Sequence, residues 1–143
     1  MALIKLNNQS LSNVTSAGLP SGTVLQVTQG AFTGSEYSTT STSYVSTPVT
    51  HNITPSSANS KILVILSGCH LSYYAGGQIF IKVVRTIGAT STDVSSATNW
   101  SRPSVDGTAY GYTTSGNYLD SPSTTSQVTY TVHIKSNNGA QVV

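Results

Sequence analysis

Charged side chains are scarce in this 143-residue sequence. Six residues are Lys or Arg and four are Asp or Glu, which is 7% of the chain, whereas an ordinary soluble domain carries about a quarter. The basic residues are scattered from Lys5 to Lys135 and form no run. We therefore expect neither nucleic-acid binding by phosphate neutralisation nor attraction to an anionic membrane surface.

Cysteine and long apolar runs are also lacking. Cys69 is the single cysteine, so no disulfide forms within the chain, and we expect this residue to be a small buried hydrophobe. The longest purely aliphatic run is Ile62–Leu66, far below the roughly 20 residues that span a bilayer. The first ten residues contain no apolar core of a signal peptide. We expect no membrane insertion and no export by the usual secretion route.

Hydroxyl groups are abundant instead. Ser and Thr together make 45 of the 143 residues. A disordered Ser-rich linker would lack strong apolar runs, but this chain has two, at Lys61–Leu66 and Gln78–Val84. The apolar content of 37% is below the usual 45–50%. We therefore expect a folded domain whose core is thin, or is completed by other subunits.

The first 22 residues differ from the rest of the chain. Their apolar residues keep neither a strand nor a helix period, and turn residues close the segment at Gly18–Gly22. We expect residues 1–22 to form an extended arm that anchors the chain to another protein, and residues 23–143 to form one domain. The candidate anchoring residues are Leu3, Ile4, Leu6, Leu11 and Val14.

The domain has the turn spacing of an all-β protein. Short apolar or alternating runs recur between Gly, Pro and Asn turns, and no segment has the pattern of a long amphipathic helix. The expected strands are 23–29, 49–54, 61–71, 78–87 and 127–135, with shorter ones near residues 44–45, 108–112, 118–119 and 140–143. This spacing predicts an antiparallel β-sandwich of the jelly-roll type.

Three of these segments carry specific expectations. Lys61–Leu71 has aliphatic residues on both faces, which predicts a central strand that is covered on both sides. Tyr73–Gly77 has the glycines of a hairpin connection, which makes 78–87 its return strand. Residues 88–107 are predicted to be a long loop.

The clearest alternation lies at Gln127–Lys135. The apolar residues of this strand are predicted to face inward and its polar residues outward. The inward set is Val128, Tyr130, Val132 and Ile134, and the outward set is Thr129, Thr131, His133 and Lys135.

Several segments together resemble a known group of proteins. In order along the chain they are Leu11–Pro20, Ser21–Val27, Thr42–Val45, Ile53–Ser57, Ser60–Ile65, Tyr118–Pro122 and Thr129–Tyr130. This ordered series is similar to small structural proteins of marine tailed bacteriophages, of the cyanophage type, which are described as tail-fibre-like or virion proteins. The resemblance covers most of the chain. It implies an all-β, trimeric appendage domain located in the virion, with no established enzyme activity and no cofactor.

The resemblance sets the expected function. The chain would be a homotrimeric tail-fibre or appendage subunit that mediates attachment to the host surface. Its arm would contact other virion proteins, and its loops at 73–77 and 88–107 would meet a host glycan or protein. The alternative is a capsid decoration or head-fibre protein that does not touch the host.

Aromatic loop residues are the candidate host contacts. Tyr and Trp give a large contact area at a small entropy cost, and Tyr73, Tyr74 and Trp100 fall in the expected loops. The alternative is that aromatic side chains pack within the sandwich, which we expect for Tyr110 and Tyr112 because they are two residues apart on one strand face.

Catalytic and metal sites are not expected. A glycan hydrolase would need two carboxylates across a cleft, but Asp106 and Asp120 stand at ordinary turn positions. A serine hydrolase is not expected either, because no Gly-x-Ser-x-Gly nucleophile elbow occurs. Cys69 and His70 are adjacent on a strand and would point to opposite faces. His51 and His133 are expected to be solvated, unless a trimer brings three copies of one histidine onto its axis.

Overall fold

A computed structural model describes residues 18–20, 22–73, 78–94 and 110–142, with the backbone alone at 68–73, 110–112 and 114. These residues form six strands: β1 (Val45–Ile53), β2 (Ile62–Tyr73), β3 (Ile79–Ile87), β4 (Thr90–Asp93), β5 (Tyr110–Asp120) and β6 (Val128–Ser136). All strand pairs are antiparallel. The all-β prediction is therefore confirmed. No helix in the described part of the chain is long and apolar enough to cross a membrane.

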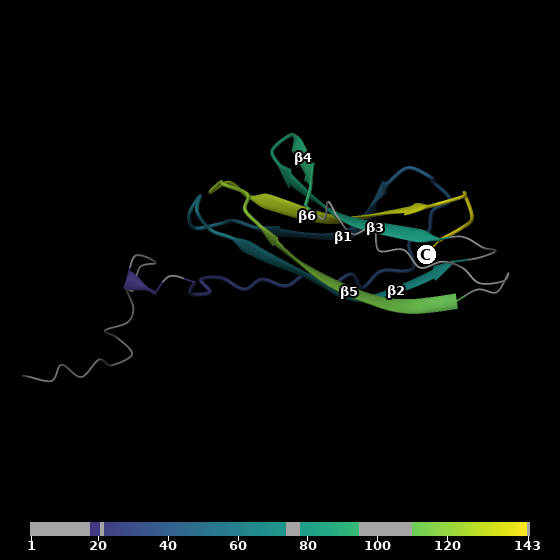
Figure 1. Cartoon of the computed structure of the whole chain (residues 1–143), viewed down its shortest axis with the longest axis horizontal. Helices are drawn as coiled ribbons and strands as arrows, with labels where there is room; N and C mark the ends of the chain where they lie inside the picture. The colour runs from purple at the N-terminus through teal and green to yellow at the C-terminus, as the bar shows by residue number, and fades with distance from the viewer. Residues whose placement is uncertain (1–17, 21, 74–77, 95–109, 143) are drawn as a thin grey trace, which may run out of the picture.

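The strands form two sheets that face each other as a sandwich (Figure 1). One sheet has four strands in the order β1-β6-β3-β4, and the other has two, β2 and β5. A jelly roll has eight strands in two sheets, so the jelly-roll connectivity stays a prediction.

Alternation along β3 and β6 builds the inner face of the larger sheet. β6 alternates strictly between buried and half-buried residues, which confirms the predicted inward and outward sets. Ile81 of β3 lies opposite Ile134 of β6, and Val83 lies opposite Val132. Because side chains alternate in a strand, matched registers bring the apolar faces of both strands to the same side of the sheet.

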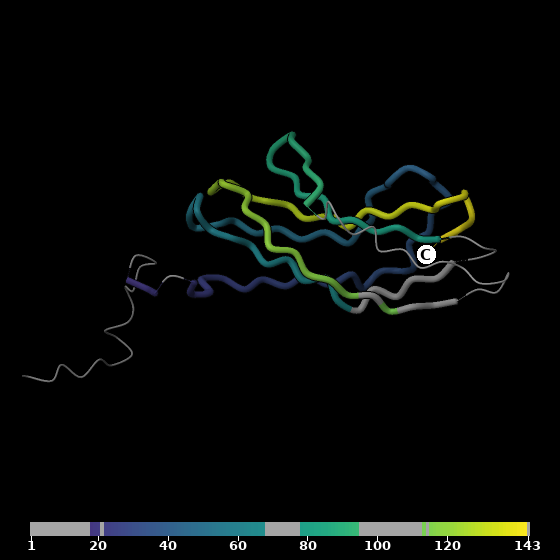
Figure 2. Tube along the Cα trace, viewed as in Figure 1, coloured from purple at the N-terminus to yellow at the C-terminus, as the bar shows by residue number. Residues whose placement is uncertain are grey.

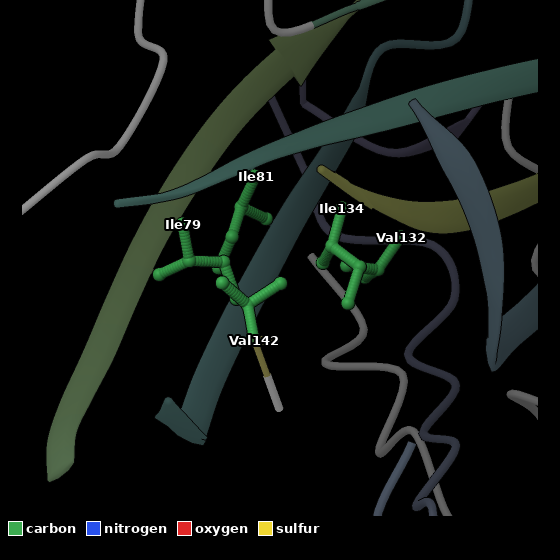
Figure 3. Close-up of a cluster of buried hydrophobic side chains, with 5 residues drawn as sticks. All are labelled: Ile79, Ile81, Val132, Ile134 and Val142. Atoms are coloured by element: carbon green, nitrogen blue, oxygen red, sulfur yellow. The ribbon is translucent and has the colours of Figure 1, made fainter. Parts of the chain in front are cut away.

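The core has two apolar clusters. Figure 3 shows the first, in which side chains from β3, β6 and the C-terminal segment point toward one another: Ile79, Ile81, Val132, Ile134 and Val142. Val142 is fully buried and its backbone pairs with Thr39. The second cluster, with Ile62 of β2 against Val83, Val128 and Tyr130, joins the two sheets.

β2 is not the central, doubly covered strand that its composition predicts. In the described chain it pairs only with β5, and Leu63 and Ile65 expose 57% and 68% of their surface. One face of β2 packs on the larger sheet through Ile62 and Val64. The described chain places no layer over the other face.

The predicted hairpin between β2 and β3 is wrong. β2 pairs with β5, and β3 pairs with β6 and β4, so the chain passes from one sheet to the other between these strands. The apolar residues of two consecutive strands specify which face is buried, but not which strand is the neighbour.

The region 88–107 contains a strand that the sequence interpretation missed. β3 and β4 form a hairpin with Ile87 opposite Thr90, joined by two residues. Gly88 has a positive φ of 57°, the conformation that a type II′ turn requires at its first central residue. Every residue of β4 is exposed, so its sequence has no apolar alternation that would predict a strand. Residues 95–107 of the predicted loop lie outside the described residues.

The predicted strand at 23–29 does not pair with another strand in the part of the chain that the structure describes. Residues 22–36 are extended and exposed throughout, and Figure 2 shows them running along most of the length of the sandwich. Gly30 lies against the side chain of His51 on β1, since a Cβ on this glycine would be 2.6 Å from Nδ1. We call residues 22–36 the extended segment.

The edge strand β1 confirms and lengthens the strand predicted at 49–54. It begins at Val45 and includes Pro48, where the pairing with β6 shifts between Ser46 and Thr50. An edge strand with a bulge tolerates proline, because the missing N–H is not needed for the ladder there.

Candidate functional site

The residues predicted to contact the host or the virion lie mostly outside the described residues. This applies to Tyr74 and Trp100, and to the anchoring residues Leu3, Ile4, Leu6, Leu11 and Val14. Tyr73 ends β2 and its backbone pairs with Tyr110, but its side chain is outside the description. These assignments, and the boundary between residues 22 and 23, stay predictions.

The outer face of the four-stranded sheet brings charged and aromatic side chains together and is the candidate functional surface. We define it as the side chains of this sheet that point away from β2 and β5. Phe80 of β3 lies opposite Lys135 of β6, and Lys82 of β3 lies opposite His133 of β6. Alternation therefore places these four side chains on the outer face. Tyr44, immediately before β1, reaches the same group.

Two lysines converge on the aromatic rings. The Nζ atoms of Lys82 and Lys135 lie 4.5 and 4.9 Å from the ring centroid of Tyr44, and Nζ of Lys135 lies 5.0 Å from that of Phe80. All three distances are within the range of a cation–π interaction. We call Tyr44, Phe80, Lys82, His133 and Lys135 the basic–aromatic group.

The two lysines differ in their electrostatic partners. Lys82 Nζ donates to both carboxylate oxygens of Asp93 on β4, at 2.8 and 2.9 Å. Among the described residues, Lys135 has neither a carboxylate partner nor a hydrogen bond from Nζ. Burial and the nearby charge of Asp93 raise the pKa of the Tyr44 phenol, so it stays protonated at neutral pH.

His133 lies beside Lys82, its register partner on β3. Burial first, and then the positive charge of Lys82, lower the pKa of its imidazole, while Asp93 opposes this shift. The ring is therefore mainly neutral at pH 7. The sequence interpretation placed His133 on the exposed side of its strand, and its outward direction is confirmed, although the ring is half-buried.

A ladder of hydroxyl and amide groups continues the outer face beyond the basic–aromatic group. Cross-strand hydrogen bonds join Thr50 to Thr131 at 3.1 Å and Thr129 to Asn52 at 2.7 Å. Thr86 and Ser91 are joined in the same way at 3.0 Å. Such cross-strand pairs stabilise a sheet while leaving a polar surface.

A different polar group joins the two sheets on the inner side. Arg85 Nη1 of β3 donates to Asp120 Oδ1 at the end of β5, at 2.7 Å. The Tyr130 hydroxyl donates to the second carboxylate oxygen at 2.6 Å. Burial, this hydrogen bond and the charge of Asp120 raise the pKa of Tyr130. Asp120 therefore does more than end a strand at a turn, because its carboxylate connects the layers.

Asp93 and Asp120 do not form a carboxylate pair across a cleft. Asp93 binds Lys82 on the outer face, and Asp120 binds Arg85 on the inner face of the same strand. In the part of the chain that the structure describes, no group of three His, Cys, Asp or Glu side chains is arranged to hold a metal ion.

Two surfaces expose large apolar side chains. On the extended segment these are Val24, Leu25, Val27 and Phe32, and on the outward side of the β2–β5 sheet they are Leu63, Ile65 and Leu119. Val27 is the most exposed of these seven side chains, at 85%. Leu63 and Leu119 lie opposite each other in register, so the apolar surface of the sheet is continuous across both strands.

The sequence carried only part of this information. It predicted the outward direction of His133 and Lys135 by alternation, but not the direction of Phe80 and Lys82, nor that β3 and β6 are neighbours. Comparison with protein-family models, curated proteins and solved structures finds no match for this chain.

Proposed function

We propose that this protein is a structural subunit of a phage virion, of the tail-fibre or appendage type, which assembles as a homotrimer and mediates attachment to the host surface. Two lines of support come from the sequence: the ordered resemblance to virion proteins of marine tailed phages, and the hydroxyl-rich, nearly uncharged composition.

The observation that carries the self-assembly in this proposal is the extended segment. Residues 22–36 are exposed throughout, and the hydrogen bonds of the described chain include no backbone pairing for residues 24–38. An extended chain with free backbone groups and apolar side chains is a template for pairing with another chain. A second copy of the same subunit would satisfy these groups and cover Leu25 and Val27, which alternation places on one side of the segment.

The uncovered face of the β2–β5 sheet supports the same proposal. Contiguous exposed apolar surface on a soluble protein marks an interaction site. Asn117 and Ser67, the outward residues next to Ile65, carry no charge, and Lys61, two residues before Leu63, lies at the end of this face. Such a surface can be buried between subunits without the cost of desolvating an unpaired charge.

Native mass spectrometry of the full chain tests the assembly. We expect a complex of three chains, each of 14.9 kDa. Val27→Asp should convert it to monomers, because a carboxylate would be buried in the contact. Gln26→Asp is the matched control, since it adds the same charge to the neighbouring exposed position of the extended segment and should keep the trimer.

The outcomes separate the two candidate roles. A wild-type chain that is monomeric at micromolar concentration contradicts the trimeric appendage and favours the alternative, a decoration protein that gains its order from the capsid lattice. A trimer that neither Val27→Asp nor Gln26→Asp weakens shows that the contact is elsewhere. Host attachment is tested separately, by binding of the purified trimer to host cells.

A further inference from the structure

The starting point is the position of the Lys135 ammonium. Its Nζ lies between the rings of Tyr44 and Phe80, 4.9 and 5.0 Å from their centroids. An ammonium has three N–H donors, and none of them is used by a hydrogen bond to a residue that the structure describes. The rings hold the cation in place, while its donors stay available to water or to a ligand.

The charge around this ammonium is unbalanced. Lys82 and Lys135 both contact the ring of Tyr44, but among the described residues only Lys82 has a carboxylate partner, Asp93. His133 adds no negative charge in either of its protonation states. In a chain with ten charged residues, this is a local excess of positive charge on a half-buried surface, where electrostatic interactions are stronger than in bulk water.

Beyond the two aromatic rings and the Lys82–Asp93 ion pair, the outer face next to the ammonium carries hydroxyl groups. Ser46 lies opposite His133 in register, and Thr50 and Thr131 follow in the adjacent row of the outer face. Hydroxyl groups both donate and accept hydrogen bonds, as the hydroxyls of a sugar do. This sheet face therefore offers one cation beside a row of hydroxyls. It matches a ligand that has many hydroxyl groups and a few negatively charged ones.

We propose that the outer face of β1, β6 and β3 binds a negatively charged saccharide. An acidic group of the sugar contacts Lys135, and its hydroxyls contact Ser46 and the Thr50–Thr131 pair. A nucleic acid fits this surface poorly, because its affinity depends on several phosphate contacts at once. The proposal goes beyond the attachment role above, and it holds for a monomer as for a trimer.

Binding can be measured on the full chain with three probes. They are an oligogalacturonate, its methyl ester, which has the same sugars without charge, and a sulfated oligosaccharide of the same length. We expect the oligogalacturonate to bind, the ester to bind at least tenfold more weakly, and binding to weaken as salt screens the charge. The sulfated probe distinguishes the source of the anion, carboxylate or sulfate.

A pair of variants assigns the binding to Lys135. Lys135→Gln should weaken oligogalacturonate binding about tenfold, the size expected when one charge-assisted hydrogen bond is lost. Lys61→Gln removes the same charge from an exposed position just before β2 and should leave binding unchanged. Lys135→Arg keeps the cation and should retain binding, which covers the case in which Lys135→Gln fails to fold.

The NMR amide shifts of the wild-type chain give an independent measurement. The oligogalacturonate should move the signals of Ser46, Thr131 and Lys135 more than those of the β2–β5 sheet. Equal binding of the charged probe and its ester overturns the proposal, as do equal losses in Lys135→Gln and Lys61→Gln or the absence of any binding. These results leave the trimer mass unaffected, so the failure of this site is distinguishable from failure of the assembly.

Discussion

The two ion pairs of β3 offer a matched test of how burial sets the strength of a charge interaction. Arg85–Asp120 and Lys82–Asp93 have nearly the same length, 2.7 and 2.8 Å. Their side chains differ in exposure, at 17% and 9% in the first pair and 20% and 52% in the second. We predict that Asp120→Asn destabilises the protein far more than Asp93→Asn.

The magnitude follows from what each substitution leaves behind. Asp120→Asn leaves the Arg85 guanidinium buried without a counter-charge, which costs about 3 kcal/mol, at the lower end of the range for breaking a buried pair. The remaining amide oxygen can still accept from one of its two donors, Arg85 or Tyr130. Asp93→Asn leaves Lys82 next to water and to the ring of Tyr44, so its cost should be about 0.5 kcal/mol.

Urea unfolding monitored by circular dichroism measures both values. With a slope of about 2 kcal/mol per molar urea, the midpoint should fall by about 1.5 M for Asp120→Asn and by about 0.3 M for Asp93→Asn. All variants must be compared at one protein concentration, because the stability of an oligomer depends on it.

A double variant tests the physical cause. Arg85→Met combined with Asp120→Asn removes the uncompensated charge, so it should be less destabilising than Asp120→Asn alone. Equal midpoint shifts for Asp120→Asn and Asp93→Asn would refute the argument that burial strengthens the first ion pair. A double variant that is less stable than Asp120→Asn would refute the argument that an unpaired guanidinium causes the loss.

Three further predictions concern the sheet that carries Lys135. Because burial and Lys82 hold the pKa of His133 below 6.5, the unfolded chain binds more protons below about pH 6.5 and stability falls as the pH drops. His133→Asn should reduce this slope in urea midpoints between pH 7.5 and 5, and an unchanged slope contradicts it. Gly88→Ala, at a φ of 57°, should cost about 1 kcal/mol in the same assay, and no loss would show that the turn tolerates a Cβ. Val128→Ala, fully buried, should cost about 2 kcal/mol, and a loss below 0.5 kcal/mol, about that of a surface change, would contradict its core position.

Local alternation made β3 and β6 of the larger sheet predictable. β6 has apolar residues at every second position, so its extent and its inward face follow from the period of two. β3 keeps this pattern at Ile79, Ile81 and Val83, and Arg85 takes the next inward position. β4 could not be found in this way, because all four of its residues are polar and exposed. The extended segment shows the reverse error. It was predicted to be a strand because it has the apolar residues of one, but no strand pairs with it in the described chain.

The amino-acid sequence was enough to predict the class of the fold and the direction of the side chains on β6, and its low charge leaves few ion pairs to form. The tertiary structure decided which strands are neighbours, and with that every site in the molecule. Phe80, Lys135 and Tyr44 meet only because β3, β6 and the start of β1 lie side by side, and Asp120 meets Arg85 only because β5 lies over the larger sheet. The physical reason is that side-chain periodicity depends on the local backbone, whereas strand pairing depends on how the apolar faces of distant segments are buried together.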